Sequence, residues 1–313
     1  MCEYSLIVPH YNDIEGLKRL IRSVPDRSDI QIIIVDDNTY EEPGRIRKEL
    51  AGVTDSYDNA VIEIYVNGPV RSAGACRNIG LDHADGKWLV FADADDWFTE
   101  GAFDVFDTHA GDKEDLIYYA STSVELPDMT PGVRHVYYVD AIRRYIEDRS
   151  TEAYLKYQVV VPWAKMVRRD MVEKNRIRYD EVRWSNDVMF SVKTAYCASS
   201  VSAYMDCVYC VTRKQGTLTS KRSEEEFKTR FDVYVSEYDY LRGNLNRRDF
   251  RFAMGGTGVW VVRAVTEGYG ISAIKYVLNT YRKNHIMLTF PISNSVKYIL
   301  SWFRTGRHDR RYD

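Results

Sequence analysis

The chain has 313 residues, which is enough for one large domain with a sizeable core and an extension. Its 43 basic and 46 acidic residues nearly cancel, and this balance argues against the positive field that nucleic-acid binding needs. No apolar stretch is long enough for a transmembrane helix and no basic leader opens the chain, so the five cysteines are expected to be reduced thiols in a cytoplasmic protein.

The first hundred residues alternate between strand-like and helix-like segments. The strand-like segments are rich in β-branched residues, and the helix-like segments repeat apolar residues every three or four positions. The expected strands are residues 5–9, 30–37, 60–66 and 88–92, and the expected helices between them are residues 13–24, 43–53 and 72–84. Such alternation predicts an α/β fold whose mainly parallel central sheet is flanked by helices.

The pattern becomes mixed after residue 115 and helical after residue 220. Residues 115–126 and 204–212 are strand-like, whereas residues 139–158 are helix-like. Ser223 and Glu226 form a capping box that begins a long helix, and more helical patterns follow. We therefore expect two domains: residues 1–220 with the sheet, and a helical C-terminal extension over residues 221–313.

Three aspartates, Asp93, Asp95 and Asp96, directly follow the apolar run that ends the first series. Two unit charges about 4 Å apart repel by roughly 4 kcal/mol at an effective dielectric near 20, so water or a cation must weaken the repulsion. A solvated loop that caps a helix is one interpretation. The other is a site for Mg²⁺ or Mn²⁺, which would neutralise phosphate oxygens and stabilise a departing diphosphate.

A second acidic pair, Asp36 and Asp37, ends the strand-like run of residues 30–37. The carboxyl ends of parallel strands meet at one edge of a sheet, where ligands bind in open α/β folds. An aspartate there can accept a hydrogen bond from a base or a ribose, although an Asx turn is also common at such positions. No glycine-rich dinucleotide fingerprint follows the first two strands, which disfavours a dehydrogenase.

Five segments in this order resemble a family-2 glycosyltransferase of the bacterial capsular and surface polysaccharide type. The segments are SLIVPHYN, IIIVDDNT, NGPVRSAGACRNIGLDHADGKWLVFADADDWF, VPWAKMVRRDMVEKNRIRYDEVRWSNDVMFSVKTA and YCVTRKQGTLTS. The resemblance covers residues 4–220 and implies the GT-A nucleotide-sugar-binding fold. It also implies an inverting transfer from a nucleotide diphosphate sugar, with a UDP-sugar as the expected donor and Mn²⁺ or Mg²⁺ as the cofactor.

The resemblance also implies which residues bind the donor. Pro9 and Tyr11 would line the base pocket, and Asp37 with Asp36 would contact the uracil or ribose. Arg77 and Asn78 resemble the family's Arg-Asn pair beside the base and sugar, and Arg71 is a second candidate. An ordinary helix with a surface arginine is the alternative for this pair. In the acidic cluster, Asp93 would meet the ribose, Asp95 the metal, and Asp96 the metal or the donor sugar.

Asp187 is the expected general base, which removes the proton from the acceptor hydroxyl as it attacks the sugar. In the family this base is the aspartate of a Glu-Asp pair, but the pair here is Asn186-Asp187. The amide of Asn186 can still hydrogen-bond a hydroxyl or orient Asp187, but it cannot ionise. The alternative role for Asp187 is to cap the helix that follows it.

Four further residues are candidates for binding the acceptor or the diphosphate. Trp163 and Trp184 offer flat faces for a sugar acceptor, with buried packing as the alternative. Arg213 and Lys214 follow the last expected strand and would close over the diphosphate, with a solvated basic turn as the alternative. Lys165, near the first tryptophan, is expected to pair with a carboxylate.

The sequence thus predicts a glycosyltransferase that moves one sugar to a glycan or lipid-linked acceptor, without a nucleic-acid partner. The rival is a non-catalytic nucleotide-sugar-binding or scaffold subunit, which Asn186 favours. A nucleotidyltransferase is less favoured, because no glycine-rich loop with a basic residue follows the first strand. From Lys297 on, five basic and two acidic residues adjoin Trp302 and Phe303. This segment is typical of a helix that docks on the inner face of a membrane, or of one packed on the catalytic domain.

Overall fold

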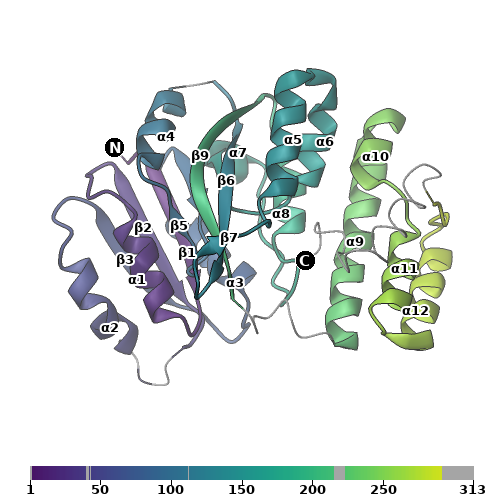
Figure 1. The fold of residues 1–313 in the computed structure, drawn as a ribbon, viewed down its shortest axis with the longest axis horizontal. Coiled ribbons are helices and arrows are strands. Elements are labelled where there is room, and N and C mark those ends of the chain that lie inside the picture. The colour runs from purple at the N-terminus through teal and green to yellow at the C-terminus, as the bar shows by residue number, and fades with distance from the viewer. Residues whose placement is uncertain (1, 40–41, 43, 112, 215–222, 291–313) are drawn as a thin grey trace. The chain divides into compact units, whose positions relative to one another are not determined.

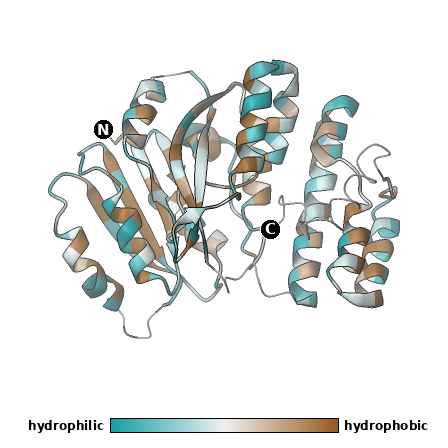
Figure 2. Cartoon of the chain, viewed as in Figure 1, coloured by the Kyte–Doolittle hydropathy of each residue, from teal (hydrophilic) through white to brown (hydrophobic). Residues whose placement is uncertain are grey.

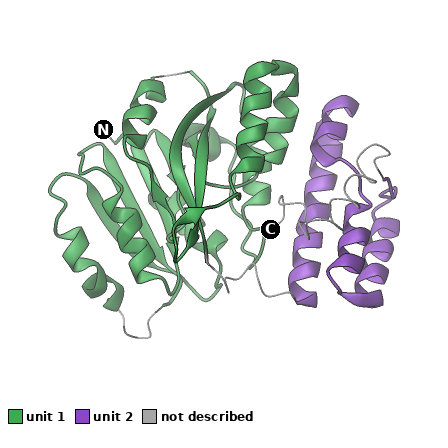
Figure 3. Ribbon diagram, in the orientation of Figure 1, with its two compact units in different colours: residues 1–215 green, residues 216–313 purple. Residues whose placement is uncertain are grey.

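The structure is a computed structural model that describes residues 2–39, 42, 44–111, 113–214 and 223–290. The chain divides into two compact units, residues 1–215 and residues 216–313 (Figure 3). The division lies close to the expected boundary after residue 220. That catalysis is confined to the first unit remains a prediction.

The first half of unit 1 is a parallel sheet in the strand order β3-β2-β1-β4 (Figure 1). Both β1 and β2 are buried along their whole length, as their continuous apolar runs predict. The edge strand β3 is only partly buried. The elements are β1 Tyr4–His10, α1 Ile14–Arg22, β2 Ile30–Asp36, α2 Arg45–Thr54, β3 Val61–Val66, α3 Ala73–His83 and β4 Trp88–Phe91.

The second half of unit 1 extends the sheet as β4-β8-β6-β9-β5, and this part is mixed. Strand β8 is antiparallel to both of its neighbours, whereas β6 and β9 are parallel. Helices α5 and α6 lie side by side (Figure 1). The elements are β5 Trp97–Phe98, α4 Ala102–Ala110, β6 Leu116–Leu126, β7 Thr130–Pro131, α5 Val136–Glu147, η1 Arg149–Thr151, α6 Glu152–Gln158, β8 Lys165–Arg168, α7 Arg169–Lys174, α8 Val188–Cys197 and β9 Val201–Lys214.

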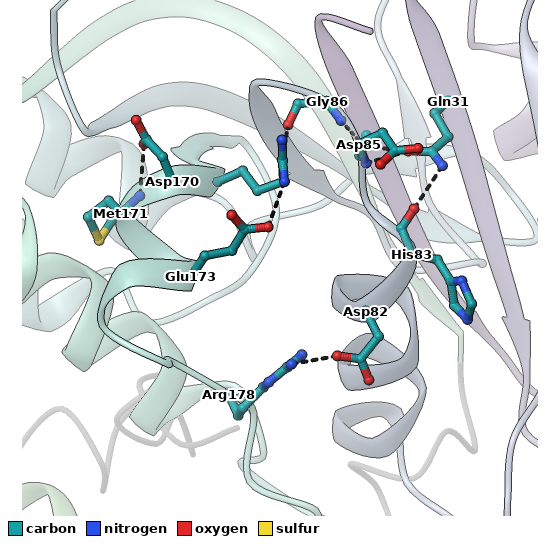
Figure 4. A network of polar contacts seen from close by, with 11 residues as sticks. Gln31, Asp82, His83, Asp85, Gly86, Asp170, Met171, Glu173 and Arg178 are labelled. Atoms are coloured by element: carbon teal, nitrogen blue, oxygen red, sulfur yellow. Dashed lines mark hydrogen bonds and ion pairs between the residues drawn. The ribbon is translucent and has the colours of Figure 1, made fainter.

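The side chain of Gln31 fastens the amino-terminal edge of the sheet (Figure 4). Its Oε1 accepts hydrogen bonds from Ser5 Oγ at 2.6 Å and from the Asp85 N–H at 2.9 Å. Its Nε2 donates to the Glu63 carboxylate at 2.6 Å and to the His83 carbonyl at 2.9 Å. One buried amide therefore joins the starts of β1 and β2 to the turn before β4, and all its polar atoms are paired.

The same edge is joined to α7 and to the segment after it. Arg169 donates to the Gly86 carbonyl at 2.8 Å and pairs with Glu173 at 2.6 Å. The half-exposed Arg178 donates to Asp82 on α3 at 2.5 Å (Figure 4). These bonds attach α7 and the segment after it to the amino-terminal edge of the sheet, and two of them are ion pairs.

Unit 2 consists of helices packed on an aromatic core. The helices are α9 Glu224–Asn244, α10 Arg247–Met254, α11 Val259–Thr266 and α12 Gly270–Lys283. The hydroxyl of Ser223 accepts the Glu226 N–H at 3.0 Å, which confirms the predicted helix start. Phe227 and Phe231 pack edge-on against the fully buried Trp260. The helices carry teal and brown residues in alternation, as helices with one buried stripe do (Figure 2).

Among the described residues, no helix has the length and apolar character needed to cross a membrane. The basic segment that begins at Lys297 lies outside the described residues, so its expected membrane docking is not addressed by the structure.

Candidate functional site

The acidic residues predicted to share one edge of the sheet do share it. Strands β1, β2 and β4 are parallel neighbours, with His10 opposite Asp36 and Ile7 opposite Phe91. Their carboxyl ends therefore lie at the same edge, and the acid loop, residues 93–96, follows β4 there. This is the position at which open α/β sheets bind ligands.

Strand β9 holds the acid loop in place. The Asp93 N–H donates to the hydroxyl of the buried Tyr209 at 2.9 Å. The Thr212 N–H donates to Asp96 Oδ1 at 2.6 Å, and the Thr212 hydroxyl donates to the Asp95 carbonyl at 3.0 Å. Tyr209 and Thr212 were not predicted as site residues, because no local pattern shows that a strand over a hundred positions away supports this loop.

The three carboxylates of the acid loop differ in their surroundings. Asp96 is 2% exposed and accepts the N–H of Thr212 on β9, so its side chain fixes the loop to that strand. Burial raises the pKa of Asp96 well above its usual value, and the charges of Asp95 and Asp93 add to this effect. Burial and the charge of Asp93 also raise the pKa of Asp95. The loop therefore carries more negative charge than its surroundings stabilise.

Arg134 is a cation near the acid loop that the sequence did not single out. It lies between β7 and α5, and its N–H donates to Ser123 Oγ at 3.1 Å. Its charge lowers the pKa of Asp95 and of Asp96, against the effect of burial. This partial compensation does not remove the upward shift of either carboxyl group.

The acid loop fits a divalent cation that is also bound by a ligand. Among the described residues, no three His, Cys, Asp or Glu side chains gather as a metal cage. Mg²⁺ and Mn²⁺ are commonly held by one or two carboxylates, with phosphate oxygens and waters completing the shell. The partly exposed Asp95 and Asp93 offer such oxygens, and a cation would relieve the repulsion that raises the pKa of Asp95.

Arg77 connects the acid loop to the segment that carries the expected base. It lies on α3 and is 4% exposed, so the alternative of a surface arginine is wrong. One guanidinium nitrogen donates to Asp93 Oδ1 at 2.6 Å, and another donates to Asn186 Oδ1 at 2.8 Å. The guanidinium also lies 5.2 Å from the centre of the Tyr179 ring. Arg77 therefore spans the candidate site.

Asn78 fastens α3 to the chain ahead of α8. Its amide donates to the Tyr179 carbonyl at 3.0 Å and accepts the Tyr179 N–H at 2.9 Å. A Cβ on Gly74 would lie 2.1 Å from the Asp180 carbonyl oxygen, so the helix approaches this segment as closely as a backbone can. Asn78 therefore faces the protein backbone, while Arg71 is exposed just before the helix.

Asp187 stands at the N-cap position of α8, but its side chain forms no capping hydrogen bond. Its carboxylate is half-buried and remains available to a ligand. Burial raises the pKa of Asp187, whereas the charges of Arg77 and Lys165 lower it. A carboxylate with a raised pKa is a stronger proton acceptor than an exposed one, which is what a general base requires.

Asn186 retains the hydrogen-bond acceptor, but not the charge, of the glutamate that the family resemblance leads one to expect. Its Oδ1 receives the bond from Arg77, and its backbone carbonyl accepts the Asp180 N–H at 3.3 Å. Because the residue is buried, a neutral amide there costs less desolvation than a second carboxylate would.

Asp36 faces into the protein. It lies 2.7 Å from His10 Nδ1 and accepts the Thr39 N–H at 2.9 Å. Burial would raise the pKa of Asp36, but the hydrogen bonds from His10 and Thr39 outweigh it and lower the pKa. Asp37 is less buried and accepts from the Asn67 amide at 2.6 Å. Of the pair, Asp37 is therefore the more accessible to a ligand, and His10 is a supporting residue that the sequence analysis missed.

The remaining donor and acceptor candidates differ in exposure. Pro9 is buried within β1, whereas Tyr11 is 50% exposed at the same edge. Trp163 is 2% exposed and stacks on Tyr209 at 5.8 Å, so the packing alternative applies to it. Trp184 is partly exposed, and its indole N–H has no hydrogen-bond partner in the described part of the chain. Trp184 is therefore the better candidate for contact with an acceptor.

Arg213, Lys214 and Lys165 are the remaining basic residues that the sequence singled out. Arg213 is exposed on β9. Lys214 ends that strand, and its side chain is outside the described part of the structure. The expected carboxylate partner of Lys165 is a prediction that proved wrong, since its Nζ donates to the Val159 carbonyl at 2.6 Å.

Comparison with known proteins identifies relatives over most of the chain. A family model described as "Glycosyl transferase family 2" matches residues 5–176. The putative glycosyltransferase EpsH of Bacillus subtilis is 25% identical over 257 residues, which cover 79% of this chain and 71% of EpsH. The cholesterol galactosyltransferase of Borreliella burgdorferi is 24% identical over 230 residues, or 70% of this chain and 62% of that protein.

A solved structure extends the likeness to the whole fold. The crystal structure of S. aureus TarS 1-349 in complex with UDP-GlcNAc matches 90% of this chain and 81% of that chain, with a TM-score of 0.66 and 18% identity. The curated Staphylococcus aureus TarS, a poly(ribitol-phosphate) beta-N-acetylglucosaminyltransferase, is 23% identical over 72% of this chain and 39% of its own length. The match confirms the predicted α/β GT-A fold and its C-terminal helices.

Proposed function

The chain belongs to glycosyl transferase family 2 and is a glycosyltransferase, and on that premise we propose an inverting, metal-dependent transfer of one sugar from a UDP-sugar. The acceptor would be a glycan or a lipid-linked saccharide in bacterial surface polysaccharide synthesis. The observation that carries the proposal is the position of Asp187. Its carboxylate forms no capping hydrogen bond to α8, and its neighbour Asn186 is joined through Arg77 to Asp93 of the acid loop.

Asp187 would act as the general base of a single displacement. The carboxylate would take the proton of an acceptor hydroxyl while the hydroxyl oxygen attacks the anomeric carbon from the face opposite the diphosphate. One attack on that face inverts the anomeric configuration. Arg77 would keep the base and the acid loop at a constant separation, because its guanidinium is bonded to both segments.

The acid loop would hold the cofactor. Asp95 would supply an oxygen ligand to Mn²⁺ or Mg²⁺, which when bound neutralises the leaving diphosphate. Asp96 would support the loop through its bond to Thr212 and take part in metal or donor binding only if it turned away from β9. The raised pKa of Asp95 supports this assignment, since a cation favours the ionised form.

The choice of substrate class is supported by the relatives. The TarS crystal structure contains UDP-GlcNAc, which supports a UDP-sugar donor. TarS and the Borreliella enzyme are named for a polymer acceptor and a sterol acceptor. Tyr11 and Asp37 are the accessible candidates for the uridine, and Trp184 is the accessible candidate for the acceptor.

We assign catalysis to residues 1–220, and docking to the acceptor or the membrane to residues 221–313. The family match lies within the first of these ranges, at residues 5–176. The cysteines are free thiols, which fits the reducing cytoplasm, with the inner face of the membrane as the place where a lipid-linked acceptor would be met.

A non-catalytic nucleotide-sugar-binding subunit is the second candidate, and Asn186 favours it. An amide at this position leaves Asp187 as the one ionisable side chain of the pair. Such a subunit would bind UDP through the same edge of the sheet without turning over a donor. Turnover and binding measured on one preparation therefore separate the two candidates.

A donor screen followed by the Asp187→Asn substitution tests the proposal. Melting temperature is first recorded with UDP-glucose, UDP-galactose, UDP-GlcNAc and UDP-GalNAc, each with and without Mn²⁺, and the most stabilising donor is kept. We expect Asp187→Asn to lower UDP release from that donor by at least about a thousandfold while UDP still binds.

Asp180→Asn is the matched control, because Asp180 is a half-buried carboxylate of the same segment whose pKa is also raised by burial. It should leave UDP release within about twofold of the unsubstituted chain. Unchanged release in Asp187→Asn would refute the assignment of the base, and indifference to every nucleotide would favour the binding subunit.

A further inference from the structure

Lys165 is a buried amine that the proposed displacement does not use. It opens β8 and is 4% exposed. Its Nζ donates to the Val159 carbonyl at 2.6 Å and lies 5.1 Å from the centre of the Tyr118 ring. Within the described residues it forms no ion pair with a carboxylate. A lysine buried under these conditions loses its proton far more readily than an exposed one.

Hydrogen bonds join the segment that binds the Lys165 amine to the helix that follows Asp187. The Ser191 hydroxyl on the first turn of α8 donates to the Val160 carbonyl at 2.6 Å, next to the carbonyl that binds Lys165. The Ser191 N–H donates to the Asp187 carbonyl at 3.0 Å. The segment before β8, to which Lys165 is bonded, is thereby joined to the start of α8, which follows Asp187.

The electrostatics of the two groups agree with this placement. Burial lowers the pKa of Lys165 to about 7, and the charge of Asp187 acts in the opposite direction. The charge of Lys165 in turn helps to lower the pKa of Asp187, which burial raises. Each group therefore responds to the protonation state of the other.

Arg77, Asp93 and Tyr179 are the other titratable groups that interact electrostatically with Asp187. Arg77 on α3 keeps its positive charge, and its pKa is raised by Asp93 and Asp187 although burial opposes this. Asp93 lies in the acid loop and is paired with Arg77. The buried Tyr179 hydroxyl has a pKa raised well above its usual value, so it stays neutral. Lys165 is the neighbour whose pKa is brought by burial to about 7.

We propose that Lys165 is a positioning residue whose charge sets the pH range over which Asp187 works as a base, an inference that rests on the proposed function. When protonated, the amine stabilises the carboxylate and extends base catalysis to lower pH. When neutral, it exerts no such effect, and Asp187 is governed by Arg77 and by its burial. The proton taken from the acceptor hydroxyl stays on Asp187 and does not pass to Lys165 in this scheme.

The test is the pH profile of kcat/KM for UDP release from the donor selected by the screen, with water as the acceptor. In Lys165→Met, we expect the acidic limb to move up by about one pH unit, since loss of a neighbouring cation raises a carboxyl pKa by roughly that amount. kcat/KM should therefore fall about tenfold at pH values on the acidic limb and stay within about twofold on the plateau above it. Lys165→Gln should behave in the same way, and it gives a second variant if one folds poorly.

Tyr118→Phe is the matched control. It removes a buried hydroxyl that contacts no hydrogen-bond partner among the described residues, and it keeps the ring beside Lys165. The acidic limb of the kcat/KM profile of Tyr118→Phe should lie at the same pH as that of the unsubstituted chain.

Two outcomes overturn the inference: an unchanged acidic limb in Lys165→Met, or an equal loss of kcat/KM at every pH, which indicates structural support alone. If Asp187→Asn is inactive and either result is found, the inference fails while the proposed function stands. If Asp187→Asn remains active, the proposed function itself fails.

Discussion

The two edges of the sheet in unit 1 are built on opposite electrostatic principles. At the amino-terminal edge, the Gln31 amide is fully hydrogen-bonded, and Arg169 is paired with Glu173. At the carboxyl-terminal edge, Asp95 and Asp96 are crowded and their pKa values are raised. The first edge stabilises the fold, and the second holds charge that only a ligand can fully compensate.

Arg77 is the exception at the second edge, because two of its guanidinium nitrogens donate to Asp93 and Asn186, although its buried Nε has no hydrogen-bond partner among the described residues. Arg77, which positions the site, is bonded to Asp93 and Asn186, whereas the carboxylate of Asp187, which would meet the acceptor, forms no capping hydrogen bond. The predictions below separate these two kinds of residue.

The largest effect is expected for Arg77→Met. The substitution leaves Asp93 and Asn186 without their shared donor, so kcat/KM for UDP release should fall by about a thousandfold or more. The free energy of unfolding should fall by about 2–3 kcal/mol, less than for a fully buried pair because the Asp93 side chain is 31% exposed. UDP release and denaturant unfolding measure the two effects.

Arg178→Met is the control for the loss of an arginine ion pair. Its partner Asp82 is more than half exposed, so stability should change by less than about 0.5 kcal/mol and UDP release should not change. Equal behaviour of the two arginine variants would break the distinction between the two edges.

Gln31→Leu should separate stability from activity. It removes the side-chain donor to the His83 carbonyl and one of the two acceptors of the Asp85 N–H, the other being Ser5 Oγ, so the free energy of unfolding should fall by about 1–3 kcal/mol. Because the amino-terminal edge contacts no reacting group in the proposed mechanism, kcat/KM per folded molecule should stay within about twofold. A large loss of kcat/KM with normal stability would show that this edge also serves catalysis.

The smallest expected effect is the change in melting temperature when Mn²⁺ is added. The pKa of Asp95 is raised above its usual 3.8, so the folded chain binds this proton more tightly than the unfolded chain does. Stability is therefore lost as pH rises from 3.8 through the folded pKa, and a cation that replaces the proton restores it. Saturating Mn²⁺ should raise the melting temperature by a few degrees at about pH 7.5, and less at about pH 4.

Asp95→Asn should abolish most of this response to Mn²⁺, whereas Asp104→Asn, on the exposed surface of α4, should preserve it. An equal response in both variants would mean that manganese binds elsewhere on the chain.

Local patterns in the sequence determined the first part of the fold and the place of the site. Strands β1 and β2 are buried on both faces, so their runs are continuously apolar, and the crossover helices repeat apolar residues at helical spacing. Once the sheet is parallel, the acidic residues that follow its strands must share an edge. Strand β8 was not predicted, because it has four residues and two of them, Lys165 and Arg168, are charged, so no apolar run marks it.

Only the tertiary structure decided which side chains meet at that edge. Arg77 and Asn186 are 109 positions apart, and Asp96 and Thr212 are 116 apart. Asp36, which ends β2, and Asp37, which follows it, differ because Asp36 is bonded to His10 and Asp37 accepts from Asn67. Such choices depend on packing and on competition between hydrogen-bond partners distant in the chain, and a local pattern carries no information about either.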